Sequence, residues 1–326
     1  MHALSPLVTI AIPTYNRADN YLRQALTCAL TQTYPHLEII VSDNGSSDHT
    51  PDYVTGLADS RIRYFRHDRN IGPNNNFNYC LQQAKGDFFV LLHDDDLIDQ
   101  DFIETCLNAR EDARDIGIIR TGTRVIDAKE NVVREVPNLV EGSSTEDFFL
   151  SWFRGKTSPY LCSTLFHTES LRAVGGFNSP YNLLQDVKAE VQLAAMFGRI
   201  DVQDIKASFR RHELELTRMT SVSDWCRESL LLLDLMCELV PNNRHVVYPE
   251  ARRFFANLCY RRAASVHTPL KRFGCYARVF QAFRFRHPPP PLYRMLFRNR
   301  ASQRILKASR LLKNSLTTAK KRVSAF

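Results

Sequence analysis

The sequence predicts an α/β fold in which a mainly parallel sheet is flanked by helices, followed by a helical and basic C-terminal region. Three observations support this fold class. Short apolar runs rich in β-branched residues alternate with helical patterns along the first 100 residues, the order that is typical of a parallel sheet covered on both faces. Polar residues follow directly after several of these runs, where such sheets bind ligands. Beyond about residue 222, helical patterns replace the strand patterns.

The predicted elements follow one another in a regular order at first. We expect strands at 7–12, 37–41, 62–65 and 87–92, separated by helices at 18–33, 48–57 and 74–84. In the first helix, apolar residues recur at the spacing of one helix face, at Leu22, Ala25, Leu26 and Ala29. The second half is less regular, with a helix at 101–115, β-structure at 116–136, a short helix within 137–158, a strand at 160–166, a helix at 186–197 and a pair of strands within 200–210.

Charge is divided unevenly along the chain. Residues 251–326 contain 19 Lys and Arg and no Asp or Glu, whereas the other 250 residues contain 24 basic and 35 acidic residues. An acidic domain followed by a basic tail predicts different partners for the two parts. The eight cysteines show no CxxC spacing, which favours reduced thiols over a zinc site. We find no signal peptide and no apolar stretch of about 18 residues, and so expect a cytoplasmic protein.

The fourth predicted strand runs directly into His93, Asp94, Asp95 and Asp96. Three adjacent carboxylates repel one another at neutral pH, and each resists removal from water. A divalent cation such as Mg²⁺ or Mn²⁺ would offset this cost, because it prefers oxygen ligands and commonly shares them with phosphates. From the acids alone, a solvated acidic turn is the alternative.

A set of short motifs occurs in order over roughly residues 1–215. They are Val8–Arg17, Glu38–Asp48, Asn70–Gly72, Ala84–Asp87, Leu91–Asp96, Gly175–Phe177, Gln185–Asp186 and Arg210–His212. Each motif alone is weak evidence for any family. Together, in this order, they resemble glycosyltransferase family 2, the nucleotide-sugar-dependent inverting enzymes of the GT-A fold. The resemblance implies a GT-A domain at 1–220, with a nucleotide-binding half at about 1–100 and an acceptor half at about 101–220. Residues 221–326 would then form the helical, basic C-terminal region.

The resemblance also implies how the nucleotide is held. The loop after the first strand would line the base, through Pro13, Thr14, Tyr15 and Asn16. Asp43 would accept a hydrogen bond from the imide N–H of uracil or thymine, and the alternative is that it caps the Asn44-Gly45 turn. Asn74 would shape the pocket wall beside the nucleotide, with an ordinary loop as the alternative.

The run from His93 to Asp96 resembles the DXD element of the family, with His93 where many members carry Asp. The resemblance implies that Asp95 binds the metal, Asp94 lies near the ribose and Asp96 is a further or alternate ligand, although a shift by one position would exchange these roles. His212, which follows a basic late strand, would contact the metal or the diphosphate. An ordinary surface histidine is the alternative.

Asp186 matches the second residue of the Glu-Asp pair of the family, which implies that it is the general base. It would take the proton from the acceptor hydroxyl as that oxygen attacks the anomeric carbon. The preceding residue is Gln185 instead of Glu, so a neighbouring charge is absent. The alternative is that Asp186 caps the helix that follows.

The predicted function is transfer of a sugar from a UDP- or dTDP-sugar, with Mg²⁺ or Mn²⁺, to a glycan or lipid-linked glycan in surface polysaccharide biosynthesis. Two alternatives are a sugar-nucleotide nucleotidyltransferase and a catalytically degenerate family member that acts as a binding subunit. The basic tail, with a helical pattern at 304–316, suits an anionic membrane surface, so we expect peripheral association with the inner face of the cytoplasmic membrane. A solvated tail, an oligomer contact and, least favoured, nucleic acid are the alternatives.

Overall fold

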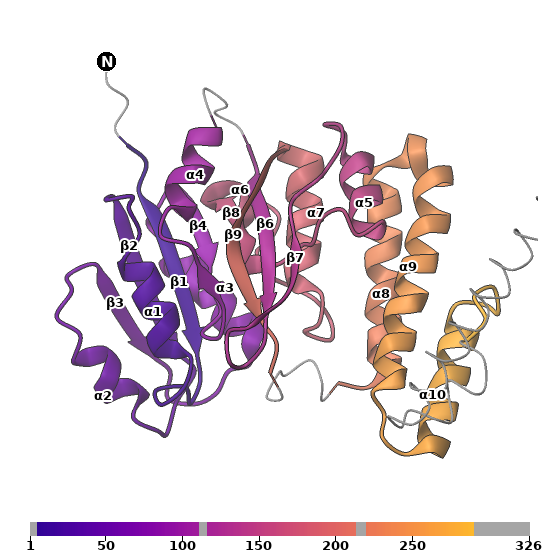
Figure 1. The fold of residues 1–326 in the computed structure, drawn as a ribbon, viewed down its shortest axis with the longest axis horizontal. Helices are drawn as coiled ribbons and strands as arrows, with labels where there is room; N and C mark the ends of the chain where they lie inside the picture. Colours follow the sequence, from indigo (N-terminus) through magenta and orange to yellow (C-terminus); the bar gives the residue numbers. More distant parts are fainter. Residues whose placement is uncertain (1–4, 111–115, 213–219, 290–326) are drawn as a thin grey trace, which may run out of the picture. The chain divides into compact units, whose positions relative to one another are not determined.

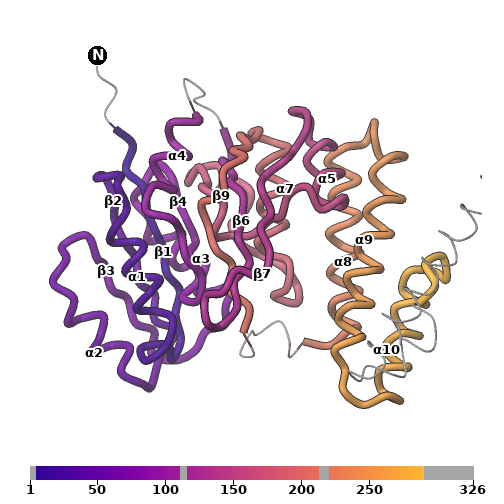
Figure 2. Tube along the Cα trace, viewed as in Figure 1, coloured from indigo at the N-terminus to yellow at the C-terminus, as the bar shows by residue number. Residues whose placement is uncertain are grey.

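The computed structural model describes residues 5–110, 116–212 and 220–289. Within these residues the centre of the fold is a nine-stranded sheet in the order β3-β2-β1-β4-β8-β6-β9-β5, with β7 paired to β6. Figures 1 and 2 show the indigo and purple strands of the first half continuing into the magenta and orange strands of the second. The sheet therefore joins both halves of the predicted domain.

The first half of the sheet is parallel, as predicted. β1 (Val8–Thr14), β2 (Leu37–Asp43), β3 (Ile62–Arg66) and β4 (Phe88–Leu91) alternate with α1 (Leu22–Leu30), α2 (Thr50–Thr55) and α3 (Pro73–Gln83). Every residue of β1 is buried, because its two faces are covered and β2 and β4 pair with its two edges. The predicted apolar face of α1 is confirmed, since its four residues are fully buried.

Gly86 sets the position of β4 against β1. Its N–H donates to Thr9 Oγ1 at 3.0 Å, and an added Cβ would lie 2.6 Å from Thr9 N. Only glycine allows this approach without moving β1. At the other end of the pair, Leu92 N–H donates to Ala11 O at 2.9 Å, so the residues that follow Leu92 begin beside the end of β1.

The second half of the sheet is mixed. β8 (Thr164–His167) is antiparallel to both β4 and β6 (Ile118–Ile126), whereas β9 (Arg199–Arg210) is parallel to β6. β7 (Val132–Val136) and β5 (Leu97–Ile98) complete the sheet, and its helices are α4 (Phe102–Ala109), α5 (Thr145–Phe153), α6 (Thr168–Ala173) and α7 (Gln185–Phe197), with a 3₁₀ turn η1 at Leu161–Ser163. The expected pair of strands within 200–210 is one strand, because β9 pairs with β6 along one edge and with β5 near its end.

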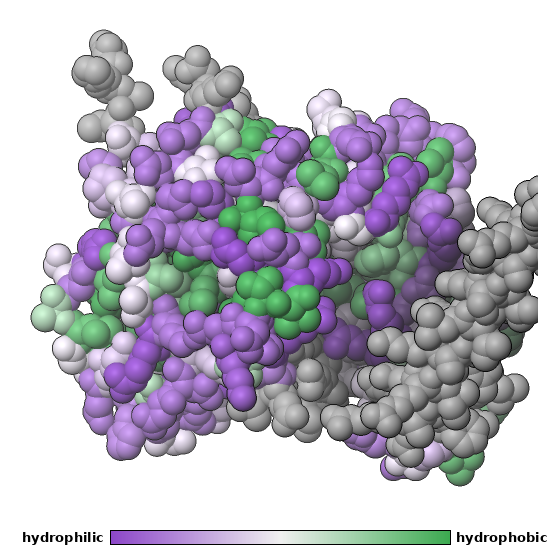
Figure 3. Space-filling view, viewed as in Figure 1, coloured by the Kyte–Doolittle hydropathy of each residue, from purple (hydrophilic) through white to green (hydrophobic). Residues whose placement is uncertain are grey.

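Three longer helices follow the sheet, α8 (Val222–Leu239), α9 (Arg244–Ala264) and α10 (Pro269–Ala282), with η3 at Pro241–Asn243. Among the described residues, one compact unit combines the sheet region with Arg227–Phe254, and a second takes in Ser221–Cys226 and 255–289. Among the described residues no helix is long and apolar enough to cross a membrane. On the face shown in Figure 3, hydrophilic residues cover most of the surface over the sheet, as is typical of a surface in contact with water.

Candidate active site

The carboxyl ends of β1, β2 and β4 bring three of the predicted motifs to one edge of the sheet. Thr14 ends β1 in register with Asp43 of β2. Thr14 Oγ1 donates a 2.7 Å hydrogen bond to Asp94 Oδ2, and Arg17 Nε lies 3.9 Å from Asp94 Oδ1. Burial and the charge of Asp95 raise the pKa of Asp94 to about 7. Asp94 is thus bound to the loop after β1, and its contact with a ribose stays a prediction.

Asp95 is held by residues from the end of β9. His212 Nε2 donates to Asp95 Oδ2 at 2.7 Å, across 117 positions of sequence, and Arg210 Nε donates to the Asp95 carbonyl oxygen at 2.8 Å. Burial opposes ionisation of Asp95, but the bond from His212 and the nearby positive charges lower its pKa. Two predicted metal ligands, Asp95 and His212, are therefore brought into direct contact.

The side chain of Asp96 points into the interior of the protein. Its Oδ1 accepts the backbone N–H of Arg210 at 2.9 Å, and the Cys162 thiol is a further hydrogen-bond partner. The residue is 2% exposed, and burial together with the charge of Asp95 raises the pKa of its carboxyl well above the usual range. Asp96 therefore attaches the acidic loop to β9 while its other oxygen, Oδ2, lies 3.9 Å from His93 Nδ1.

His93, Asp95 and Asp96 form the group whose chemistry fits a metal ion. Each offers one ligand atom, and these atoms lie within 4.8 Å of one another. Carboxylate oxygens with an imidazole nitrogen suit Mn²⁺ and, less well, Mg²⁺. Burial lowers the pKa of His93, which favours the neutral ring that a metal requires. The sequence-based prediction included His212 among the metal ligands and left out His93. The position of His93 directly before the three acids was the feature of the sequence that could have indicated it as a ligand.

Asp43 is fully buried at the end of β2. Its Oδ1 accepts the Ser46 N–H at 2.7 Å and its Oδ2 accepts the Tyr64 hydroxyl at 2.6 Å. The turn cap that was the alternative to base recognition is thus present. Both oxygens keep a second lone pair, so contact with a nucleotide base remains a prediction. Tyr64, an ordinary strand residue in the sequence, was missed as the partner that orients this carboxylate.

The loop after β1 is tied to the loop after β2. Asn16 has a left-handed backbone with φ of 55°, its N–H donates to Ser46 Oγ at 2.8 Å, and its Oδ1 accepts the Ser47 N–H at 2.8 Å. Pro13 is buried, and Tyr15 is 45% exposed. Of the four residues predicted to line a base, Tyr15 is therefore the one that presents a ring at the surface.

Asn74 joins this edge to the segment before α7. Its Nδ2 donates to the Ser179 carbonyl oxygen at 3.2 Å, and Ser179 Oγ donates to Gln185 Oε1 at 3.2 Å. Asp186 is the second residue of α7 and accepts the Val187 N–H at 2.8 Å. Leu184 occupies the cap position, so Asp186 is not the helix cap. Burial, reinforced by the charge of Glu228, raises the pKa of Asp186 to about 6.

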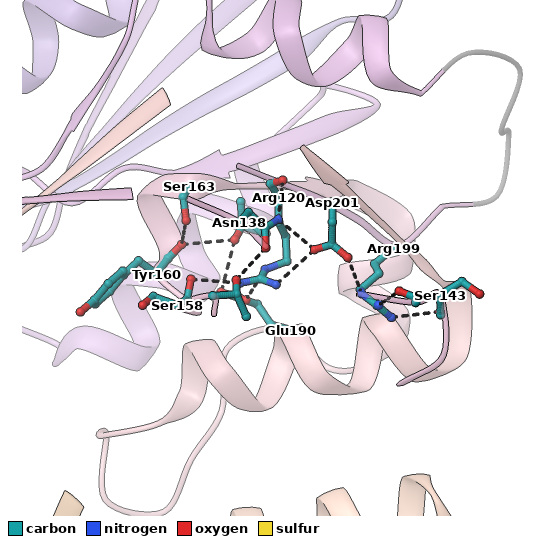
Figure 4. Close-up of polar contacts among 12 residues, drawn as sticks. Arg120, Asn138, Ser143, Ser158, Tyr160, Ser163, Glu190, Arg199 and Asp201 are labelled. Atoms are coloured by element: carbon teal, nitrogen blue, oxygen red, sulfur yellow. Dashed lines mark hydrogen bonds and ion pairs between the residues drawn. The ribbon is translucent and has the colours of Figure 1, made fainter. Parts of the chain in front are cut away.

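A buried polar network connects β6, α7 and the connection at 137–158 (Figure 4). Arg120 in β6 is fully buried; its Nε lies 3.2 Å from Glu190 Oε2, and its Nη2 donates to Thr157 Oγ1 and the Ser158 carbonyl oxygen at 3.1 and 3.0 Å. Glu190 is on α7, one turn after Asp186. Burial raises the pKa of Glu190 to about 7, against the opposing charge of Arg120. This pair was not predicted from the sequence, although an arginine within an apolar strand signals a buried partner.

The same network reaches the connection before α5. Asp201 in β9 accepts hydrogen bonds from Arg199 Nε at 2.7 Å and Asn138 Nδ2 at 2.9 Å (Figure 4). Arg199 in turn donates to the carbonyl oxygens of Ser143 and Ser144. The polar connection at 137–158 is therefore attached to β9 through charged side chains.

Comparison with known proteins gives the family of the chain. Residues 9–173, half of its length, match the model described as Glycosyl transferase family 2. The chain belongs to this family. The match contains the β1 loop, Asp43, Asn74 and the acidic run, and it ends before Asp186 and His212. The match therefore does not test the roles predicted for those two residues.

Relatives and solved structures agree with this assignment. The chain is 34% identical over 187 residues to an uncharacterized glycosyltransferase of Rickettsia felis, covering 56% of this chain and 30% of that protein. It is 43% identical over 94 residues, 28% of this chain and 30% of that protein, to the GalNAc(5)-diNAcBac-PP-undecaprenol beta-1,3-glucosyltransferase of Campylobacter jejuni. The chain spans less than half the length of these relatives.

Two groups of structures share the fold. S. aureus TarS 1-349 in complex with UDP-GlcNAc has a TM-score of 0.59 and 16% identity, covering 85% of this chain and 89% of that one. The mannosyltransferase PcManGT from Pyrobaculum calidifontis, in complex with GDP-Man and Mn²⁺, has a TM-score of 0.53 and 19% identity, covering 86% and 82%. The predicted GT-A fold is thereby confirmed.

Replacing Arg120 with Met should lower the free energy of unfolding by about 3–5 kcal/mol, because Glu190 would stay buried without its positive partner. Urea denaturation measures the change. The control is Lys156→Met, since Lys156 pairs with Glu141, whose side chain is 82% exposed, and exposed pairs contribute less than about 1 kcal/mol. Equal, small losses in both variants would show that the Arg120 pair adds nothing.

Proposed function

We propose that the protein is a metal-dependent inverting glycosyltransferase that moves a sugar from a UDP- or dTDP-sugar to a hydroxyl group of a glycan or lipid-linked glycan. The observation that carries this proposal is the grouping of His93, Asp95 and Asp96 at the carboxyl end of β4 in a chain of family 2. Carboxylates at this position suit a cation shared with a diphosphate. The UDP-GlcNAc and GDP-Man named with TarS and PcManGT support a nucleotide-sugar donor.

In this mechanism each group has a separate task. A cation held by His93, Asp95 and Asp96 would neutralise the charge that develops on the departing diphosphate. Asp186, with a pKa of about 6, is ionised at neutral pH and takes the proton from the acceptor hydroxyl. The oxygen attacks the anomeric carbon on the face opposite the diphosphate, so a single displacement inverts the configuration. Arg17, beside Asp94, adds positive charge at the same edge.

The rival enzyme class is a sugar-nucleotide nucleotidyltransferase. Such an enzyme would carry a glycine-rich phosphate loop directly after the first strand, whereas residues 13–17 of this chain contain no glycine. The non-enzymatic rival is a degenerate subunit that binds donor without transferring it. The half-buried carboxyl of Asp186, with its raised pKa, favours an active enzyme.

The name of the Campylobacter relative supports a lipid-diphosphate-linked acceptor and a role in surface polysaccharide biosynthesis. Contact with an anionic membrane through the C-terminal region fits such an acceptor. On α10, Leu270 and Phe273 are 81% and 49% exposed, and Lys271 and Arg278 are exposed on the same helix, the composition of a helix that binds an anionic surface. The predicted helix at 304–316 lies outside the described residues.

Asp186→Asn should lower kcat by about 10²–10⁴-fold, because an amide cannot accept the proton, while donor affinity changes by less than about twofold. Wild-type kcat should fall as the pH decreases below about 6, since a raised pKa means that Asp186 is neutralised sooner than an ordinary carboxylate. A radiolabelled-donor transfer assay over pH 5–8 measures both effects. Asp127→Asn, in an exposed turn, is the control. Full activity in Asp186→Asn would exclude this residue as the base.

UDP or dTDP should raise the melting temperature by several degrees when Mn²⁺ is present and by much less with chelator, because the ligand binds only the folded chain. Asp95→Asn should remove the Mn²⁺-dependent part. A thermal-shift panel measures this, with ADP as the nucleotide control and Asp19→Asn as the exposed acidic control. A rise in melting temperature that is the same with Mn²⁺ and with chelator, and the same in Asp95→Asn, would contradict the proposed metal site.

The full chain should float with phosphatidylglycerol vesicles and separate from them at high salt, because Lys and Arg near an anionic surface contribute about 1 kcal/mol each. A Leu270→Ser/Phe273→Ser double variant, or a chain ending at 292, should float less. Val132→Ser/Val133→Ser, which removes exposed apolar side chains of β7, is the control. If both the α10 variant and the shortened chain float as well as the full chain, the membrane proposal is rejected. If RNA, but not high salt, displaces the protein from the vesicles, nucleic acid is the favoured partner of the basic region.

A further inference from the structure

Glu228 of α8 makes an unusual set of contacts with the segment that leads into α7. The side chain is 2% exposed. Its Oε2 accepts the Tyr181 N–H at 2.9 Å, and its Oε1 accepts the N–H groups of Leu183 and Leu184 at 3.2 and 2.7 Å. One buried carboxylate thus binds three backbone donors within four consecutive residues.

These three bonds satisfy backbone donors just before α7, of which the Leu183 N–H has Ser179 Oγ as a second, longer acceptor at 3.3 Å. Leu184 is the cap residue of α7, and it makes no side-chain capping bond, so amides at this end of the helix need outside acceptors. Asn182, inside the same segment, has a left-handed φ of 55°, a conformation that costs free energy in a residue other than glycine. Hydrogen bonds to a charged acceptor are stronger than neutral ones, and they hold this segment in one conformation.

The segment is attached on its other side to the nucleotide-binding half. Ser179 O accepts the hydrogen bond from Asn74, and Ser179 Oγ accepts the Leu183 N–H at 3.3 Å. The two residues after Leu184 are Gln185 and Asp186. The position of Asp186 therefore depends on a short segment that is tied at one end to α3 and at the other to α8.

We propose that Glu228 is a positioning residue for the general base: by binding the amides of residues 181–184, it fixes where Asp186 stands when the acceptor hydroxyl arrives. This inference rests on the proposed function. It assigns part of the active site to α8, which lies outside the residues that match the family model.

The charge of Glu228 gives the proposal a measurable consequence. After burial, the charge of Glu228 contributes to the raised pKa of Asp186. Glu190 on the same helix also interacts electrostatically with Asp186, and Glu190 is paired with Arg120 of β6. Removing the negative charge of Glu228 while leaving Glu190 and Arg120 in place should therefore lower the pKa of Asp186.

The test is Glu228→Gln in the full chain, with Glu238→Gln as the matched control on the exposed side of the same helix. The amide has the same shape, but it loses the charge and turns an NH₂ group toward one backbone donor. We expect kcat to fall about 10–100-fold, as for a base displaced by about 1 Å, with the donor KM nearly unchanged. The acid limb of the kcat–pH profile should move to lower pH. Glu238→Gln should behave as wild type.

Hydrogen exchange supplies a readout that does not depend on activity. The amides of Tyr181, Leu183 and Leu184 should lose protection in Glu228→Gln and keep it in Glu238→Gln. Glu228→Asp retains the charge at a shorter reach, so it should lower kcat while leaving the acid limb close to its wild-type position. If Glu228→Gln does not fold, the proposal is tested with Glu228→Asp, by measuring its kcat and the hydrogen exchange of the same three amides.

The outcomes separate the two proposals. A wild-type chain that transfers no sugar from any tested donor would refute the proposed function. An active wild type in which Glu228→Gln keeps its kcat and its acid limb, and loses only thermal stability, would show that Glu228 is a structural brace and would overturn this inference alone.

Discussion

Repulsion among three consecutive carboxylates at the end of β4 is the constraint on which the rest of the site depends. Each carboxylate is stabilised by contacts with a different part of the chain. Asp94 is bound by Thr14 and lies near Arg17 of the β1 loop, Asp95 by His212, and Asp96 by the Arg210 backbone. The contacts from Arg210 and His212 come from the end of β9, more than 110 positions away in the chain. The long pairing of β9 with β6 and β5 is therefore needed to place these partners, because a frayed β9 would leave the acids uncompensated.

A second set of buried charges lies on the acceptor side, around α7. Arg120 is paired with Glu190, and Glu228 accepts three backbone hydrogen bonds. Burial is the main cause of the raised pKa of Asp186, and the charge of Glu228 adds to it. A neighbouring negative charge, which is absent at position 185, is thus supplied by Glu228 of α8.

The two sets meet through few contacts. Asn74 connects α3 to Ser179, and Ser179 connects to Gln185 at the start of α7. The proposed metal-binding edge is built on parallel strands and the proposed base on a helix terminus, so the two can be adjusted separately. The match to the family 2 model contains the three carboxylates and their partners Thr14 and Arg17, whereas Arg210 and His212 lie beyond it. The second set lies largely beyond residue 173.

Local pattern was sufficient for the alternation of strands and helices, the apolar face of α1 and the acidic run at a strand end, because these depend on residues close together in the chain. It could not show that His93 joins Asp95 and Asp96, that Tyr64 orients Asp43, or that Arg120 and Glu228 support α7. The same pattern also suggested two strands within 200–210 where the fold has one. The grouping of His93 with Asp95 and Asp96 depends on how the short loop after β4 folds. The other contacts, and the single strand β9, depend on pairing between segments tens of positions apart, and only the folded chain brings such segments within hydrogen-bond distance.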